Sequence, residues 1–136
     1  SYVKIGQLTN ISDLLFREFN IIDLNEIYLY NVTSMIAETT AVKKYIQIEK
    51  RNDAGIDKNK NSISWLGRLE ENIIPGSIDP EKIVVIGDFG FDLPICLDYR
   101  DTCLEPTVIY LDVNVWIKIA ENYKEFIRKL SVLDII

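Results

Sequence analysis

Carboxylates are the side chains of this chain most able to do chemistry, and they concentrate in its C-terminal half. Between positions 88 and 112, six acidic residues accompany one base, Arg100; the acids are Asp88, Asp92, Asp98, Asp101, Glu105 and Asp112. Converging carboxylates could act as general acid and base, or bind magnesium or calcium. Exposed acids could instead receive a basic protein. Aspartate is also common in turns because it accepts bonds from nearby backbone N–H groups. The spacing leaves all three interpretations open.

The remaining residue types exclude several kinds of catalytic site and metal site. The chain has no histidine, which excludes Ser-His-Asp and Cys-His catalysis and His-ligated zinc. Its two cysteines, Cys96 and Cys103, fit neither a zinc knuckle nor a C-x-x-C redox pair, so we expect reduced thiols, with Cys96 buried. The segment 87–90 (Gly-Asp-Phe-Gly) lacks the Lys-Ser/Thr pair of a phosphate-binding loop, which favours a hairpin turn. The calcium-loop pattern D-x-[DN]-x-[DN]-G is also absent, so we expect no metal and no cofactor, and the carboxylate metal site stays an alternative only.

Net charge, hydropathy and length indicate the class of partner, the location and the number of domains. Fifteen basic against 21 acidic side chains give a net charge of −6, which disfavours binding to nucleic acid or to anionic membranes and favours a basic protein. No apolar run reaches the roughly 18 residues of a membrane helix, and no signal-peptide pattern follows Ser1, so we expect a cytoplasmic protein. With 136 residues, 48% of them hydrophobic, the chain is expected to form one domain over 1–136.

The elements that must position the acids are clearest after residue 80. A short apolar run rich in β-branched residues predicts a strand over 83–86, and further apolar runs predict strands over 93–97, 107–111 and 115–120, with a polar loop over 100–106. The connections are too short for helical crossovers, which favours an antiparallel meander. Asn122 and Glu125 form a capping-box-like helix start, and Tyr123, Phe126 and Leu130 follow at helical spacing. The predicted fold class is α+β, a single antiparallel, meander-like sheet flanked by helices.

The N-terminal half gives weaker patterns. Helix and strand interpretations compete over 8–31. Asn31 or Thr33 is predicted to cap a helix that runs to about residue 51, with an apolar face made of Met35, Val42, Tyr45 and Ile46. The segment 52–62 is predicted to be a surface loop, and 64–72 a short helix with Trp65, Leu66 and Leu69 inward.

The stretch 83–100 resembles the signature of the SUKH superfamily, the Smi/Knr-like proteins. In that signature a strand ends in Gly-Asp, as at 87–88, and the chain returns after a short turn through an apolar strand to an aspartate, as at Asp98. The pattern continues over 106–112, 116–120 and 123–127, so the resemblance covers roughly 70–130. The turn after Asp88 is shorter than is usual in the family. The resemblance implies a structural role for Gly87, Asp88, Gly90, Pro94, Asp98, Pro106 and Trp116.

The resemblance implies a binding protein without catalytic residues, not an enzyme. Bacterial members resemble immunity proteins that bind and neutralise a cognate polymorphic toxin, often a nuclease or deaminase; fungal members are scaffolds in cell-wall regulation. Because a nuclease cleft is basic, we expect the toxin to contact exposed loop acids: Asp88, Asp92, Asp98, Asp101 and Glu105. Two alternatives stay open. One is a regulatory scaffold, and the other is a metal-assisted hydrolase that uses Asp88, Asp92 and Asp98.

Overall fold

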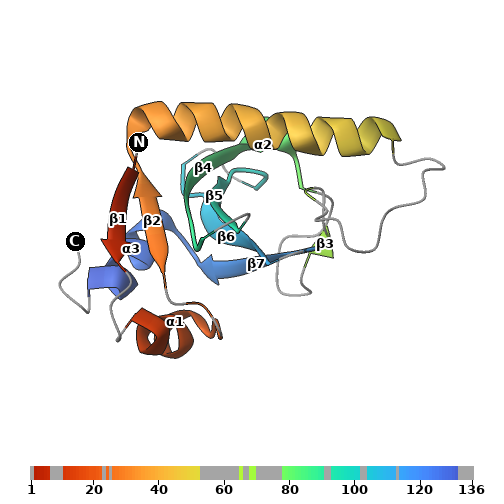
Figure 1. Ribbon diagram of the computed structural model, residues 1–136. Helices are drawn as coiled ribbons and strands as arrows, with labels where there is room; N and C mark the ends of the chain where they lie inside the picture. Colours follow the sequence, from red (N-terminus) through yellow and green to blue (C-terminus); the bar gives the residue numbers. More distant parts are fainter. Residues whose placement is uncertain are drawn as a thin grey trace.

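A computed structural model describes residues 2–6, 11–22, 24, 26–52, 65, 68–69, 78–90, 93–101, 104–112 and 114–131 (Figure 1). The elements follow one another as β1 (Tyr2–Gly6), α1 (Ile11–Phe19), β2 (Ile27–Tyr30), α2 (Val32–Asn52), β3 (Arg68–Leu69), the 3₁₀ turn η1 (Pro80–Lys82), β4 (Ile83–Asp88), β5 (Pro94–Asp98), β6 (Thr107–Asp112), β7 (Val115–Ala120) and α3 (Tyr123–Ser131). The predicted α+β class is confirmed.

The described strands form one sheet in the order β1-β2-β4-β5-β6-β7-β3. Strands β4 to β7 make the predicted antiparallel meander, and β1 and β2 extend it antiparallel beyond β4. The edge strand β3 departs from the prediction, because it pairs in parallel with β7. The helix expected over 64–72 is therefore wrong at Arg68 and Leu69: pairing with a neighbouring strand outweighs the local helical pattern. Apart from Trp65, the rest of that segment lies outside the described residues, as does most of the loop predicted over 52–62.

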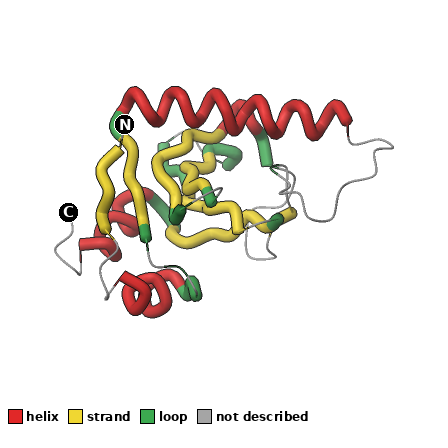
Figure 2. The backbone as a smooth tube through the Cα atoms, in the orientation of Figure 1, coloured by secondary structure: helices red, strands yellow, loops and turns green. Residues whose placement is uncertain are grey.

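Helices cover both faces of the sheet, as Figure 2 shows by colour. Side chains of α1 and α3 share one apolar cluster with residues of β2 and β4 to β7, whereas Val42 and Ile46 of α2 share a second cluster with the opposite face. Strand β6 shows the alternation behind this division: Val108 belongs to the first cluster and Ile109 to the second. The prediction that helices flank the sheet is confirmed.

Helix α2 begins where the sequence predicts. The side chain of Asn31 accepts a hydrogen bond from the Ser34 N–H at 2.9 Å, which caps the first turn. Val42 and Ile46 are buried as expected, but Tyr45 is 44% exposed. Tyr45 lies about 100° around the helix from Ile46, at the margin of the buried face, and its ring packs against Trp65 with centroids 4.9 Å apart.

The segment 8–31, for which helix and strand competed, contains one of each, α1 and β2. At the other end of the chain, α3 starts as predicted. Asn122 accepts a hydrogen bond from the Glu125 N–H at 2.8 Å, and the Glu125 carboxylate pairs with Lys129 at 3.2 Å. Phe126 is buried, whereas Tyr123 is 43% exposed at the edge of the packed face. Within the described residues, no helix has the length and apolar character needed to cross a membrane.

Candidate functional site: an acidic, aromatic pocket at the β4–β5 turn

Asp98 is buried rather than exposed. Its side chain accepts hydrogen bonds from Nε of Arg100 at 3.0 Å and from Nη2 at 2.9 Å, and only 1% of the residue is exposed. The Arg100 side chain is itself 8% exposed, so the two charges neutralise each other out of solvent. The prediction that Asp98 is an exposed interface residue is wrong, because Arg100 folds back over it at the end of β5.

The acids of the β5–β6 loop lie in the expected environment. Asp101 and Glu105 are exposed, and Leu104 between them is 84% exposed. Pro106, where the loop joins β6, is buried. Two predicted residues, Asp92 and Cys103, lie outside the described residues.

Asp88 ends β4 in a half-buried position. One carboxylate oxygen accepts the Gly90 N–H at 2.8 Å, and the other accepts the hydroxyl of Tyr30 from β2. The chain then turns into β5, with the Phe89 N–H donating to the Leu93 carbonyl at 3.1 Å. This hairpin confirms the turn predicted for the Gly-Asp-Phe-Gly segment.

Two glycines bring β2 close to Asp88. A Cβ at Gly87 would lie 2.2 Å from the Tyr28 carbonyl oxygen, so only glycine permits β2 to approach β4 at this point. Gly90 has φ of 116°, and a Cβ there would lie 2.6 Å from a Glu26 carboxylate oxygen. The two glycines thus allow Glu26 and the tyrosines of β2 to lie next to the turn.

Asp88 and Asp98 lie at opposite ends of the same hairpin. In the β4–β5 register Asp98 is paired with Ile83, whereas Asp88 is paired with Pro94. The two positions are five residues apart along β4 and four along β5, which is roughly 14 to 17 Å at about 3.4 Å per residue. Asp88 and Asp98 therefore cannot contact one ion, which contradicts the alternative of a hydrolase centre made by Asp88, Asp92 and Asp98 together. Among the described residues, no three His, Cys, Asp or Glu side chains are grouped to hold a metal ion.

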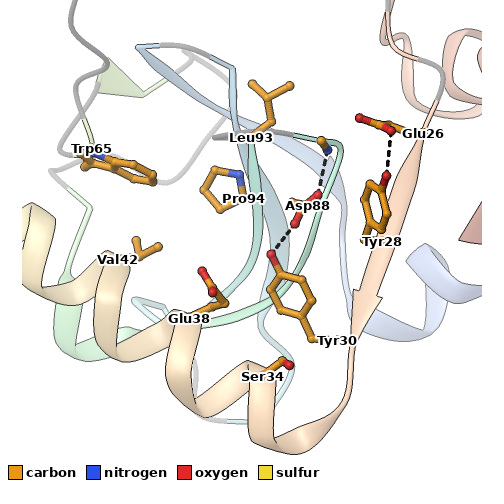
Figure 3. Close-up of a pocket in the computed structure, with 11 residues that line it drawn as sticks. Glu26, Tyr28, Tyr30, Ser34, Glu38, Val42, Trp65, Asp88, Leu93 and Pro94 are labelled. Atoms are coloured by element: carbon orange, nitrogen blue, oxygen red, sulfur yellow. Dashed lines mark hydrogen bonds between the residues drawn. The ribbon is translucent and has the colours of Figure 1, made fainter. Parts of the chain in front are cut away.

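A pocket of about 540 Å³ opens beside Asp88, between β2, α2 and the start of β5 (Figure 3). Its volume lies within the range typical of ligand sites. Polar lining comes from Glu26, Tyr28, Tyr30, Ser34, Glu38 and Asp88. The apolar lining is Val42, Trp65, Leu93 and Pro94, with Gly90 at the rim of the turn. In Figure 3 Glu26, Tyr28, Tyr30 and Asp88 lie on one side, Trp65 and Val42 on the opposite side, and Pro94 and Glu38 between them.

The pocket has a negative electrostatic character. Burial raises the pKa of Asp88, and the negative charge of Glu26 raises it further, while hydrogen bonds from Tyr30 and Gly90 act in the opposite direction. Burial and the bond to Asp88 hold the pKa of Tyr30 far above its usual range, so its hydroxyl stays protonated and donates. No lysine or arginine is among the described residues that line the pocket.

Trp65 is a firmly held wall of the pocket. The backbone carbonyl oxygen of Trp65 accepts a hydrogen bond from Nε1 of the fully buried Trp116 at 3.1 Å. The backbone N–H of Trp65 donates to the Glu49 carboxylate of α2. Trp116 thus positions the backbone of Trp65 from the core.

Cys96 of β5 is a fully buried free thiol, as predicted, and burial raises its pKa.

Most of the pocket lining could not be identified from the sequence, which predicts a partner contact for Asp88 alone among these residues. Glu26, Tyr28 and Tyr30 lie in the segment 8–31, for which helix and strand compete, whereas Glu38 lies in a helix that the sequence predicts but is given no role there. A usable signal was present: in Glu-Ile-Tyr-Leu-Tyr (26–30), polar or aromatic residues alternate with aliphatic ones, which is typical of a strand with two different faces.

Comparisons with known proteins do not place the chain in a family. A scan against protein-family models found no match, and searches of curated proteins and of solved structures found none either. The resemblance to Smi/Knr-like proteins therefore stays a sequence-based prediction.

Proposed function

We propose that this protein is a non-catalytic protein-binding domain, an immunity protein that binds a basic cognate toxin and blocks it. The observation that carries the proposal is the β5–β6 loop. There Leu104 is 84% exposed and stands between the exposed acids Asp101 and Glu105. A large exposed apolar side chain with an acid on either side of it in the sequence suits a protein interface, in which the apolar residue is buried and the charges select the partner.

The loop is held at both ends, which reduces the entropy lost on binding. On one side, Asp98 and Arg100 form their buried ion pair, and the Tyr99 N–H donates to the Lys82 carbonyl at 2.8 Å. On the other side, Pro106 is buried at the start of β6. The exposed acids thus project from an anchored segment.

Charge supports a basic partner, and the family resemblance supports a toxin. The net charge of −6 attracts positive surfaces at long range and speeds their association. A toxin that cleaves or modifies nucleic acid needs a basic cleft, so an acidic inhibitor can compete for that surface.

The experiment uses the full chain as bait in lysate and medium from its own organism, at low and at moderate salt. We expect one basic protein to be retained at moderate salt and to lose its toxic activity when the bait is added. Several unrelated partners would contradict the immunity proposal in favour of a scaffold, and no partner would contradict both.

A pair of charge-matched variants makes the test specific. Asp101→Lys with Glu105→Lys should abolish retention at moderate salt, because it reverses both acids beside Leu104. The control, Asp13→Lys with Asp112→Lys, makes the same change in net charge at two exposed positions in α1 and at the far end of β6. Equal loss in both variants would show that only net charge matters, and would remove the loop from the interface.

A further inference from the structure

The pocket at the β4–β5 turn is divided into two chemically different sides. Carboxylates of Glu26 and Asp88 lie with Tyr28 and Tyr30 on one side, and the opposite side is formed by Trp65 and Val42 (Figure 3). A ligand that fills it must therefore carry a positive group at one end of an apolar stem. Lysine and arginine side chains have this construction.

We propose that this pocket binds an arginine side chain of a polypeptide partner, with the guanidinium at Asp88 and the alkyl stem along Pro94 toward Trp65. The inference deepens the proposed function, on which it rests for the source of the arginine. It adds a second contact site, at the end of the β4–β5 hairpin opposite the β5–β6 loop.

The negative charge at Asp88 is not neutralised by the described part of the chain. Its hydrogen-bond donors, the Tyr30 hydroxyl and the Gly90 N–H, are both uncharged. Glu38 of α2 is exposed at the same pocket, and Glu26 lies beside the turn. The charges of Glu26 and Asp88 repel each other, and a cation bound between the carboxylates of the pocket would relieve that repulsion.

The geometry favours a guanidinium over a metal ion. The three carboxylates come from three separate segments and are not grouped closely enough to hold one ion. A guanidinium distributes five N–H donors over a plane, so it can bond to dispersed acceptors and stack on aromatic rings at the same time. Tyr30 and Trp65 supply such rings in the pocket lining.

The apolar side of the pocket favours a polypeptide as the source of the arginine. Free arginine would bring a charged α-ammonium and a charged α-carboxylate against that side, whereas an arginine within a chain has uncharged amides there. The pocket volume of about 540 Å³ leaves room for backbone next to the side chain. Local contacts position both sides of the pocket: Trp116 and Glu49 bond to the backbone of Trp65, whose ring packs against Tyr45, and the Gly90 N–H bonds to Asp88.

The test is an NMR titration of the full chain with a capped Gly-Arg-Gly peptide, following the Trp65 indole and the Gly90 amide. We expect saturable shifts at these two signals and not at Phe126 in the opposite cluster. The same peptide with citrulline, which has the arginine shape without the charge, should bind at least tenfold more weakly. Capped lysine peptide and free arginine should both bind more weakly than the capped arginine peptide.

Two variants test whether the carboxylates of the pocket bind the arginine peptide. Asp88→Asn keeps the size of the side chain and should weaken the arginine peptide about tenfold. Glu38→Gln, at an exposed position that should not affect folding, should weaken it by a smaller factor. The control is Asp101→Asn, the same acid-to-amide change in the β5–β6 loop, which should leave the affinity unchanged.

The outcomes separate this inference from the proposed function. Equal binding of the citrulline or lysine peptide, shifts away from the pocket, or unchanged affinity in both pocket variants would overturn the arginine assignment. None of these results bears on capture of a toxin through the β5–β6 loop. Conversely, if no toxin is captured but the arginine peptide binds saturably at the pocket, the proposed function is overturned and the pocket assignment stands.

Discussion

Asp88 and Asp98 end the two strands of one hairpin and make the same local bond, yet they have opposite surroundings. Each accepts the backbone N–H of the residue two positions later, Gly90 at 2.8 Å and Arg100 at 3.1 Å. At Asp98 the guanidinium of Arg100 supplies a counter-charge, and the pair is buried. At Asp88 the additional donor is the neutral hydroxyl of Tyr30, beside an open pocket.

The comparison shows that a carboxylate's role depends on what compensates its charge. The charge of Asp98 is used within the fold, where it fixes the start of the β5–β6 loop. The charge of Asp88 stays available to a ligand, at the cost of burial without a counter-ion in the described residues. The following variants test this difference, from the largest expected effect to the smallest.

Replacing Arg100 by alanine should have the largest effect. It leaves the buried Asp98 carboxylate without a counter-charge, which costs about 3 kcal/mol of the free energy of unfolding. Urea denaturation measures the loss, and Arg128→Ala on the exposed side of α3 is the matched control. Adding Asp98→Asn should restore part of the stability. A loss below about 1 kcal/mol would mean that the ion pair is not what neutralises Asp98.

Gly90→Ala should destabilise the other end of the hairpin by about 2 kcal/mol, because alanine is strained at φ of 116° and its Cβ would displace Glu26. The same variant should weaken the arginine peptide, since the turn holds Asp88. Denaturation and the NMR titration measure the two effects. A stable variant that binds the peptide normally would contradict the role given to this turn.

Asp88→Asn should not destabilise the protein at neutral pH, in contrast to a break in the Asp98 pair. Because the pKa of Asp88 is raised in the folded state, that state binds its proton more tightly than the unfolded chain does. The wild type should therefore gain stability relative to Asp88→Asn as the pH falls through the raised pKa, until the pH is below the usual value for aspartate.

The measurement is urea denaturation of both proteins from neutral pH to about pH 4, near the ordinary pKa of aspartate. Glu26, Glu38, Tyr28 and Tyr30 face Asp88 from the neighbouring segments and are present in both proteins, so the difference between the two curves reports Asp88. Binding of the arginine peptide should weaken over the same range, because it needs the ionised carboxylate. If acidification instead stabilised Asp88→Asn relative to the wild type, the predicted direction of the pH dependence would be wrong.

Divalent cations should have the smallest effect. Asp88 and Asp98 face opposite ends of the hairpin, so magnesium, calcium or manganese should not raise the melting temperature. A rise that saturates with metal concentration and is lost in Asp88→Asn would indicate a metal site in the pocket.

The sequence predicted the meander well because each strand from β4 to β7 is a short, largely apolar run with a turn on either side. It could not predict β3, since the pairing of Arg68 with Val115 depends on a distant strand. It also could not distinguish Asp88 from Asp98. Both are aspartates at a strand end, and their difference comes from whether Arg100 folds back and where Tyr30 lies across the sheet.

The most direct test of the account is the association rate of the captured partner as a function of salt. It is measured for the wild type, for Asp101→Lys with Glu105→Lys, and for the charge-matched control at Asp13 and Asp112. We expect wild type and control to associate faster at low salt, and the loop variant to associate slowly with a flattened salt dependence. If the loop variant and the control show the same rates and the same salt dependence, the claim that this loop receives a basic protein is contradicted.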